Sequence, residues 1–433
     1  MIRLTSLVPD KSISHRAALL AALSKSDSRI DNFSPAGDCL KTVKALQDLG
    51  CPMQMDRCVL TVAARTSEIF AAPSSPIDLG NSGTGMRLLL GVLAGQPIRA
   101  TLTGDDSLKS RPMDRVAKPL GEMGARIEGT GDRVLAPVTI TGARPLKPIR
   151  WRLEPASAQV KSAILLAGLY ADGETVIEEP VATRDHTERM LTAAGVGVTR
   201  AGGEIRLRGG ASARLQGLQM RVPDDFSAAA FFIALGLLAD RMGGIEMHHV
   251  GLNPTRTAFL DTVRLMGGNV TAQVTGEEAG EPVGIVTARP SDLRGIEVPV
   301  EWVPNLIDEI PILSILAAAA SGRTVVRGAR ELRVKESDRI KSIVQMVAGF
   351  SGSVEEREDG FEITGRVSAS GAPLVAKFAR FPTFADHRIA MSVLIAAETA
   401  GQAVTVDNTD CINTSFPGFF DCLGEIHVQC DRH

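Results

Sequence analysis

Two kinds of helical segment alternate along the chain. The first kind is amphipathic and ends at a glycine, with apolar residues recurring every three or four positions, as at Val43, Leu46 and Leu49. We expect each terminal glycine to close its helix in a left-handed conformation. The segments of this kind are Asp38–Gly50, Arg111–Gly124, Asp185–Gly195, Asn253–Gly267, Glu336–Gly349 and Phe416–Gly424.

The second kind is apolar on all sides, which is typical of a helix buried in a core. Its members are Ser14–Ala22, Gly83–Ala94, Ser157–Ala167, Asp224–Ala239, Ile307–Ala320 and Asp386–Ala397. Short β-like runs lie between the two kinds, as at Arg133–Ile140, Glu174–Ile177 and Thr324–Val326. Each series recurs about every 70 to 80 residues. The pattern therefore predicts an α/β (α+β) chain built from six copies of one strand-and-two-helix unit.

The polar residues of the buried segments gather at their N-terminal ends. Helix N-termini carry unpaired N–H groups and partial positive charge, so converging ends would suit phosphate or carboxylate. N-capping explains many of the Ser and Asp residues individually, but it does not explain the cations beside them. These polar positions are Ser12, Ser14, Asn81–Thr84, Ser157, Gln159, Asp224, Ser227, Asp308, Glu309 and Asp386–Arg388.

Basic residues are concentrated near the same ends. The arginine fork binds such anions in a bidentate manner, whereas lysine acts as a mobile point charge or proton donor. The glycine-rich stretch 80–85 lacks the Gly-Lys-Ser/Thr ending of a nucleotide-binding loop. The cations in question, Lys11, Arg16, Arg111, Arg339 and Arg388, suffice for two phosphates and a carboxylate.

Two carboxylates complete this candidate set. Asp308 opens an apolar segment, and Glu336 lies between Lys335 and Arg339. A carboxylate near cations stays ionised and can exchange a proton with a positioned substrate. Asp308 as a simple N-cap remains an alternative, and His387 fits a proton shuttle as well as a structural histidine.

Composition narrows the function classes. The net charge of -3 and an aromatic content of 4% argue against nucleic acid and anionic membrane as partners. The six cysteines form no Cys-x-x-Cys pair, which is typical of free thiols in a reducing compartment. The first residues lack the apolar core of a signal peptide, and the longest apolar runs are too short to span a membrane. We expect a soluble, cytoplasmic protein.

Several motifs together resemble the 5-enolpyruvylshikimate-3-phosphate (EPSP) synthases. They occur in the order of that family and extend over nearly the whole chain. The motifs are Val8–Arg16, Leu79–Thr84, Arg111–Met113, Ser157–Gln159, Arg333–Arg339 and Asp386–Arg388.

The resemblance implies two similar domains, each made of three βαβαββ units with buried parallel helices, and a cleft between them. We place one domain at residues 11–224 and the other at 1–10 with 225–433. The two crossings near 9–12 and 223–227 would act as hinges when substrate binds.

The resemblance also implies transfer of the enolpyruvyl group of phosphoenolpyruvate to the 5-hydroxyl of shikimate 3-phosphate. Lys11, Asp308 and Glu336 would be catalytic, and no metal or organic cofactor is expected because cationic side chains take that role. The other implied partners are small molecules only, and we expect a monomer. The implied shikimate 3-phosphate residues are Lys11, Ser12, Arg16, Ser157, Ala158, Gln159, Arg184, Asp308 and Lys335; those for phosphoenolpyruvate are Lys11, Asn81, Gly83, Arg111, Gln159, Arg339, Arg388 and Thr414.

Some positions resemble the second class of the family, which includes glyphosate-tolerant members. Ala158 replaces a serine of the better-known class, and the stretches 184–187 and 414–417 match the second class. Gly83, however, is typical of sensitive enzymes, so the herbicide response stays open.

Two rival functions differ in testable ways. A UDP-N-acetylglucosamine enolpyruvyl transferase would carry a reactive cysteine shortly before Arg111-Pro112, and residues 104–110 contain none. A non-catalytic anion-binding relative would be favoured if Lys11, Asp308 or Glu336 were apolar, and all three are present.

Overall fold

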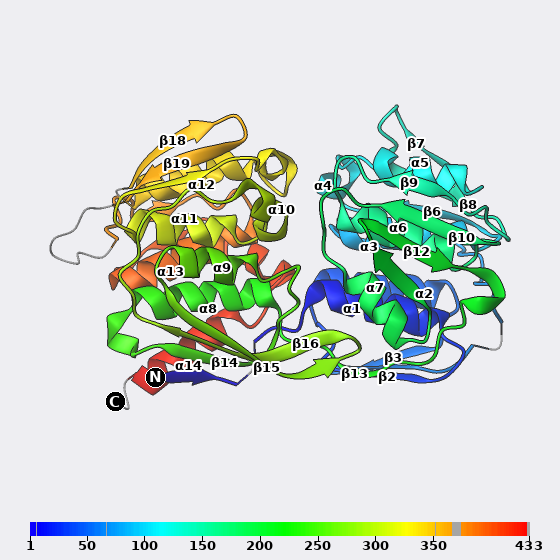
Figure 1. The fold of residues 1–433 in the computed structure, drawn as a ribbon, viewed down its shortest axis with the longest axis horizontal. Coiled ribbons are helices and arrows are strands. Elements are labelled where there is room, and N and C mark those ends of the chain that lie inside the picture. The colour runs from blue at the N-terminus through cyan, green and yellow to red at the C-terminus, as the bar shows by residue number, and fades with distance from the viewer. Residues whose placement is uncertain (6, 66, 351, 366–373, 431–433) are drawn as a thin grey trace. The chain divides into compact units, whose positions relative to one another are not determined.

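The computed structural model describes residues 1–5, 7–65, 67–350, 352–365 and 374–430, which form two compact units (Figure 1). Unit 1 comprises Met1–Val8, Asp224–Gly276 and Pro282–His433, and unit 2 comprises Pro9–Pro223 and Glu277–Glu281. The last segment differs from the division expected from the sequence, which assigned all of 225–433 to one domain. Glu281 is buried and lies 2.8 Å from His186 Nδ1, so this turn packs within unit 2.

Three helices form the core of unit 2. They are α1 (Lys11–Leu23), α3 (Gly83–Ala94) and α6 (Ala158–Gly168), and nearly all of their residues are buried. A Cβ at Gly91 of α3 would lie 2.4 Å from the carbonyl oxygen of Ala163, so α3 and α6 pack backbone to backbone. The predicted buried segments in this half of the chain are confirmed.

The strands of unit 2 repeat one pattern three times. Each sheet has four strands, of which the first two are parallel and the others antiparallel. The first sheet has the order β13 (Gln219–Arg221), β2 (Ser28–Asp31), β4 (Val59–Val62), β3 (Met53–Asp56); the second β5 (Ile77–Asp78), β6 (Arg99–Thr103), β8 (Leu135–Thr141), β7 (Arg126–Thr130); the third β9 (Arg150–Arg152), β10 (Glu174–Glu178), β12 (Glu204–Arg208), β11 (Val198–Ala201).

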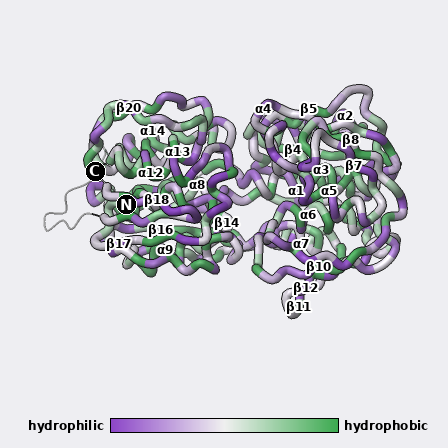
Figure 2. Tube along the Cα trace, turned by 90° about the horizontal axis from the view of Figure 1, so that it is seen from above, coloured by the Kyte–Doolittle hydropathy of each residue, from purple (hydrophilic) through white to green (hydrophobic). Residues whose placement is uncertain are grey.

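Amphipathic helices accompany these sheets, namely α2 (Gly37–Asp48), α5 (Asp114–Glu122) and α7 (His186–Ala193). The short helix α4 (Asp106–Lys109) precedes α5. Hydrophilic and hydrophobic stretches alternate along the trace of the chain (Figure 2). The predicted alternation of amphipathic and buried helices is therefore confirmed in unit 2.

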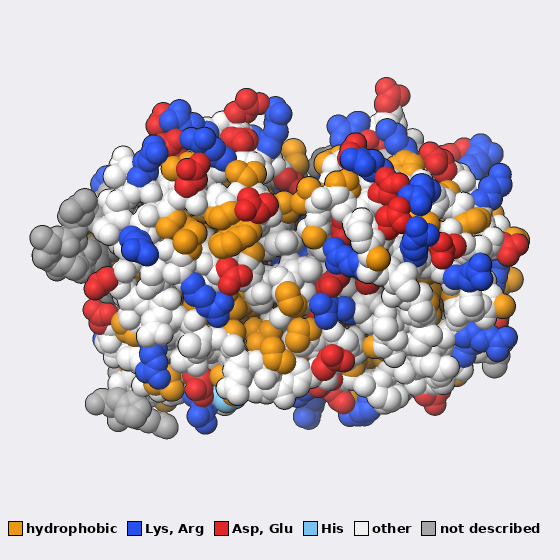
Figure 3. Space-filling model, in the orientation of Figure 1, with side chains coloured by type: hydrophobic (Ala, Val, Ile, Leu, Met, Phe, Trp, Pro, Cys, Tyr) orange, Lys and Arg blue, Asp and Glu red, His pale blue; other side chains and the backbone are white. Residues whose placement is uncertain are grey.

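Unit 1 has the same kinds of helix but less regular sheets. Its buried helices are α8 (Phe226–Leu238), α11 (Ile310–Ala319) and α13 (His387–Ala400), and its amphipathic helices are α9 (Ala258–Leu265), α12 (Arg339–Gly349) and α14 (Phe419–Cys430). Its strands form sheets β1 (Ile2–Leu4), β14 (Ile245–Gly251), β16 (Glu281–Arg289), β15 (Asn269–Glu278); β17 (Arg323–Val326), β19 (Gly360–Thr364), β18 (Ser353–Arg357); and β20 (Arg380–Phe381), β21 (Thr405–Val406). Acidic and basic side chains lie next to one another over β18 and β19 (Figure 3). Within β18, Arg357 and Glu355 form an ion pair at 2.9 Å.

The glycine caps follow the prediction at four of the six positions. Gly50, Gly124, Gly195 and Gly267 have φ values of 83°, 114°, 86° and 91°. Gly349, in contrast, is the last helical residue of α12, which is capped by Phe350. At the sixth position α14 continues through residue 424 to Cys430, so that prediction is wrong.

The predicted start of the helix at Asn253 is wrong because the side chain of Asn253 stabilises a turn instead. Its Oδ1 accepts hydrogen bonds from the backbone nitrogen of Thr255 at 2.9 Å and from the Thr255 hydroxyl at 2.7 Å. Such side-chain bonds to a nearby backbone compete with helix formation. Helix α9 consequently begins at Ala258.

Side-chain caps hold the N-terminal ends of most buried helices. Ser82, Ser157, Asp225 and Asp386 each accept a hydrogen bond from a backbone nitrogen in the first turn. In α1 the cap is Asp10, which accepts from the backbone nitrogen of Ile13 at 2.8 Å, while Ser12 and Ser14 lie inside the helix.

Two further expectations concern single features of the chain. None of the described helices combines the length and apolarity needed to cross a membrane. The six cysteines all carry free thiols, as expected from their spacing.

Candidate functional site

Arg16 is held rigidly inside unit 2. Only 4% of it is exposed, and its guanidinium donates to Thr187 Oγ1 at 2.8 Å, to Ser162 Oγ at 2.9 Å and to the backbone oxygen of Ser12 at 2.9 Å. Burial lowers the pKa of Arg16 to about 10, an effect that nearby Glu188 opposes. The side chain therefore remains a cation at neutral pH in a fixed orientation.

Arg184 is the second cation near this position. Burial lowers the pKa of Arg16 most, and the positive charge of Arg184 lowers it further. The carboxylates of Glu188, Asp10 and Glu281 oppose this effect. Arg184 thus adds a second positive charge to the surroundings of Arg16, which suits an anionic ligand.

A second group of predicted residues meets at the start of α3. Arg111 donates to Asn81 Oδ1 at 2.6 Å and to Ser107 Oγ at 3.2 Å. A Cβ at Gly83 would lie 3.1 Å from Arg87 Nη1 and 3.3 Å from Arg111 Nη1. The absence of a side chain at residue 83 thus leaves room for two guanidinium groups beside a helix N-terminus.

Gln159, the second residue of α6, forms hydrogen bonds with two residues of α3. Its Oε1 accepts from Arg87 Nη1 at 2.7 Å, and its Nε2 donates to Thr84 Oγ1 at 2.9 Å. Ser157 caps α6 through the backbone nitrogen of Val160 at 3.4 Å, and Ala158 is the first residue of that helix. The structure therefore brings the predicted residues of α3 and α6 together.

Lys11 begins α1 and forms an ion pair with Asp38 of α2, with 2.8 Å between Nζ and Oδ2. Its side chain is a quarter exposed. An ammonium group at this place can reach a ligand while its charge is balanced by Asp38.

A buried ion network lies behind Arg16. Lys161 is 0% exposed, and its Nζ lies 2.7 Å from Glu179 Oε1 and 2.8 Å from Glu188 Oε1. Glu179 also accepts from Arg200 at 2.7 Å. This network fixes α6 to α7, the two helices that supply the hydroxyl groups bound by Arg16.

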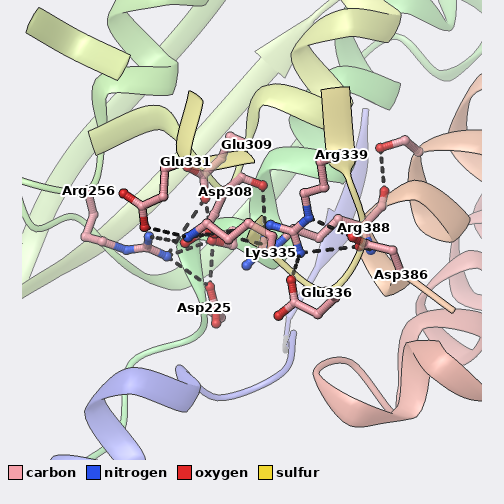
Figure 4. A network of polar contacts seen from close by, with 12 residues as sticks. Asp225, Arg256, Asp308, Glu309, Glu331, Lys335, Glu336, Arg339, Asp386 and Arg388 are labelled. Atoms are coloured by element: carbon pink, nitrogen blue, oxygen red, sulfur yellow. Dashed lines mark hydrogen bonds and ion pairs between the residues drawn. The ribbon is translucent and has the colours of Figure 1, made fainter. Parts of the chain in front are cut away.

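In unit 1 the carboxylate of Asp308 lies among four cations (Figure 4). Its Oδ1 is 3.6 Å from Arg339, 3.9 Å from Lys335 and 3.9 Å from Arg388, and its Oδ2 is 3.8 Å from Arg256. The N-cap of α11 is Glu309, so the alternative that Asp308 is only an N-cap is wrong.

Arg339 is the most deeply buried cation of this group, with 1% of its side chain exposed. Its Nε donates to Asp386 Oδ2 at 2.7 Å, and Nη2 lies 2.5 Å from Glu336 Oε2. Burial alone would lower the pKa of Arg339, but the Asp386 and Glu336 carboxylates outweigh it and raise that pKa. Burial likewise opposes ionisation of Asp386, and Arg339 nevertheless lowers the pKa of Asp386.

Hydrogen bonds hold both the backbone and the side chain of Arg388. Its backbone nitrogen donates to Asp386 Oδ1 at 3.0 Å, and its Nη1 donates to the carbonyl oxygen of Asp308 at 2.9 Å. Burial, together with the Arg388 charge, lowers the pKa of the adjacent His387 to about 4. His387 is therefore neutral at physiological pH, which favours a structural histidine over a proton donor.

Among the described residues of unit 1, no hydrogen bond or ion pair links Thr414 to the group around Asp308, although Thr414 is a predicted site residue. It ends the 3-10 helix η5 (Asp410–Thr414), and its hydroxyl donates to the carbonyl oxygen of Cys411 at 2.7 Å.

Sequence reasoning missed several residues that hold the site, above all Arg256, Ser162, Thr187 and Lys161. The sequence gives one indication for Arg256: it is a cation near the start of a predicted helix, as the predicted site arginines are. Lys161 and Ser162 were visible as polar positions inside an otherwise apolar helix.

A separate cavity of about 620 Å³ lies in unit 2. Its lining includes Leu23 and Leu169, at the C-terminal ends of α1 and α6, with Lys25 and Arg144. The predicted site residues lie at the opposite ends of these helices, so the cavity is distinct from the candidate site. Across the described residues no cluster of three or more His, Cys, Asp or Glu side chains is arranged to hold a metal ion.

Comparison with known proteins gives a consistent result over almost the full length. The family model for EPSP synthase (3-phosphoshikimate 1-carboxyvinyltransferase) matches residues 5–423. A 3-phosphoshikimate 1-carboxyvinyltransferase of Desulfitobacterium hafniense (strain DSM 10664 / DCB-2) is 45% identical over 417 residues, covering 96% of this chain and 93% of the relative. The corresponding protein of Alkalilimnicola ehrlichii is 44% identical over 424 residues, covering 98% and 93%.

Solved structures agree with these sequence matches. An EPSP synthase from Acinetobacter baumannii superposes with a TM-score of 0.86 at 40% identity, covering 98% of this chain and 95% of that chain. An enolpyruvyl transferase from Streptomyces tendae has a TM-score of 0.76 at 18% identity, over 98% and 94% of the two chains, which shows a shared fold.

Proposed function

Because the chain belongs to the EPSP synthase family, we propose that it transfers the enolpyruvyl group of phosphoenolpyruvate to the 5-hydroxyl of shikimate 3-phosphate. The observation that carries this proposal is the position of Asp308, a carboxylate with Lys335, Arg339 and Arg388 within 3.9 Å. Such a group combines proton transfer with binding of anionic substrates.

The reaction is an addition followed by an elimination. A proton is added to the methylene carbon of phosphoenolpyruvate, which makes C2 electrophilic. The 5-hydroxyl oxygen attacks C2 and loses its proton, giving a tetrahedral adduct with a methyl group. That methyl group then loses a proton as the C2–O bond to phosphate breaks, so that phosphate and the enolpyruvyl ether are released.

Shikimate 3-phosphate is assigned to cations and hydrogen-bonding groups. Arg16 and Arg184 suit its phosphate, because Arg16 is held in a fixed orientation and Arg184 adds a second positive charge to its surroundings. The hydroxyl groups of the ring are assigned to uncharged and acidic partners, which bond in a directional manner. The full set is Lys11, Ser12, Arg16, Ser157, Ala158, Gln159, Arg184, Asp308 and Lys335.

Phosphoenolpyruvate carries a phosphate and a carboxylate, and arginine binds both in a bidentate manner. Arg111 beside Gly83 and the pair Arg339 and Arg388 supply these forks. The absence of a side chain at Gly83 lets the guanidinium groups of Arg87 and Arg111 lie beside the N-terminus of α3, a place that suits an anion. The full set is Lys11, Asn81, Gly83, Arg111, Gln159, Arg339, Arg388 and Thr414.

Three residues are assigned to proton transfer. Glu336 and Lys11 would deliver and remove the protons at the methylene carbon, and Asp308 would orient or deprotonate the 5-hydroxyl. Glu336 is balanced by Arg339 and Lys11 by Asp38. Charged partners of this kind set the proton affinity of an acid or base.

The family match favours this reaction over transfer to UDP-N-acetylglucosamine. Residues 104–110, which precede Arg111-Pro112, contain no cysteine. We further assign the protein to the cytoplasm as a monomer without metal or organic cofactor. Light scattering after size-exclusion chromatography tests the oligomeric state.

The test is the release of phosphate from phosphoenolpyruvate in metal-free buffer with a chelator. The wild-type protein is assayed alone, with shikimate 3-phosphate and with UDP-N-acetylglucosamine. We expect release only with shikimate 3-phosphate. Release with the nucleotide sugar would assign the sister reaction, and no release from folded protein would leave only anion binding.

A further inference from the structure

Arg256 is a buried cation of unit 1 that none of the assignments above uses. Its side chain is 4% exposed, and it precedes α9. Its Nη2 donates to Ser227 Oγ at 2.7 Å and lies 3.6 Å from Asp225 Oδ1. The same guanidinium lies 3.9 Å from Glu309 and 3.8 Å from Asp308 (Figure 4).

The two oxygens of Asp308 face different cations. Oδ1 faces Lys335, Arg339 and Arg388, which are assigned to substrates. Oδ2 faces Arg256. A cation beside one oxygen attracts that oxygen electrostatically, which favours the carboxylate orientation in which the other oxygen faces the substrate groups.

Side chains at the N-terminal ends of α8 and α11 hold Arg256 in place. Asp225 is the N-cap of α8, Ser227 lies in its first turn, and Glu309 is the N-cap of α11. Ser227 also donates a short hydrogen bond to Glu309. Nη2 faces these helix starts while Nη1 faces Asp308, so the two nitrogens of the fork divide the contacts, which the single nitrogen of a lysine cannot do.

We propose that Arg256 is a positioning residue that orients Asp308 for its action on the 5-hydroxyl of shikimate 3-phosphate. This inference rests on the proposed function. It assigns Arg256 no contact with substrate, so its effect passes through Asp308.

The test is a double-mutant cycle of steady-state kinetics with Arg256→Gln, Asp308→Asn and the double variant. We expect Arg256→Gln to lower kcat by about 10- to 100-fold, as outer partners of a functional group do, with KM for both substrates changed less than about threefold. In the Asp308→Asn background the same change should alter kcat less than about threefold, because its target is already gone.

Arg256→Lys covers the case in which Arg256→Gln fails to fold. It keeps the buried charge but loses the fork, and we expect a folded protein whose kcat lies between those of the wild type and Arg256→Gln. Arg264→Gln is the matched control, because Arg264 is a half-exposed arginine of the next helix, paired with Asp261. Its kcat should equal that of the wild type, and thermal unfolding reports the folding of each variant.

Three outcomes would overturn the inference. These are an unchanged kcat in folded Arg256→Gln and Arg256→Lys, a rise in KM with unchanged kcat, or an equal loss of kcat in both backgrounds of the cycle. An inactive wild type would instead overturn the proposed function, and the inference with it.

Discussion

The cations of the candidate site are oriented by the protein itself. Arg16 is fixed by two hydroxyl groups and a backbone oxygen, and Arg339 by the carboxylate of Asp386. A guanidinium that is already ordered loses little entropy when it binds an anion. In the proposed function the burial of these arginines serves binding, although it makes each of them dependent on its partners.

Lys161 shows how strongly this dependence acts on stability. Lys161→Met should reduce the free energy of unfolding by about 3–5 kcal/mol, because it removes the lysine from buried Glu188 and leaves buried Glu179 with Arg200 as its remaining cation. Urea unfolding measures the loss. Lys44→Met is the control, since Lys44 forms an exposed pair with Asp48, and it should change stability by less than about 0.5 kcal/mol. Equal losses of unfolding free energy in Lys161→Met and Lys44→Met would show that the buried lysine is no more important for stability than the exposed one.

At this scale the sequence predicts candidate functional groups but not their partners. Lys11, Arg16, Arg339 and Arg388 are identifiable as candidates because each lies near the start of a helical segment. Their partners are distant in sequence, as Thr187 is from Arg16, and no local pattern connects them. Such contacts follow from tertiary packing.

The helices of the core depend on close backbone approach as well as on apolar side chains. Gly91 lies in the middle of α3, where glycine normally weakens a helix by about 1 kcal/mol relative to alanine. Here a Cβ would lie 2.4 Å from the Ala163 carbonyl oxygen and 2.7 Å from its Cα. At this position close packing therefore makes glycine more favourable than alanine, which is the reverse of the usual helix preference.

Gly91→Ala should consequently destabilise the protein by about 1–3 kcal/mol, because α3 and α6 must move apart. Gly121→Ala in α5 is the matched control, since nothing lies within 4 Å of a Cβ there. That change should be neutral or stabilise by up to about 1 kcal/mol. Chemical unfolding of both variants measures the change in the free energy of unfolding and its sign. A stabilising Gly91→Ala would contradict the predicted clash between α3 and α6.

Element boundaries were predictable where the pattern alone decides them. The segment Gly83–Ala94 matches α3, because its apolar residues and Ser82 cap act locally. The helix expected from Asn253 starts five residues later, since a side-chain turn replaces its first part. The fold class follows from the repeated pattern, whereas the return of residues 277–281 to unit 2 depends on the buried pair of Glu281 and His186.

At the scale of the whole molecule, each unit contains a buried histidine near a helix start. Burial lowers the pKa of His15 to about 3, although Asp38 opposes this, and burial lowers the pKa of His387 to about 4. The unfolded chain binds a proton at each of these residues below about pH 6.5, whereas the folded protein does not. Their contribution to stability is therefore full above that pH and is lost as pH falls toward 4.

The free energy of unfolding should thus fall on acidification, with each histidine contributing a slope of up to about 1.4 kcal/mol per pH unit. His15→Gln should remove one such contribution, and urea unfolding between pH 7 and pH 4.5 measures it. His427→Gln is the control, because that histidine is half exposed. Parallel curves for His15→Gln and the wild type would show that His15 does not contribute.

In the proposed reaction, enolpyruvyl transfer proceeds by addition and elimination, and Glu336 takes part in the proton transfer. The reaction is tested by running it in D₂O and analysing the product by mass spectrometry. We expect deuterium in the methylene group of the enolpyruvyl product when phosphoenolpyruvate and shikimate 3-phosphate are both present, and little product from Glu336→Gln. Product without deuterium would exclude the addition of a solvent proton, and undiminished turnover by Glu336→Gln would exclude the role of Glu336.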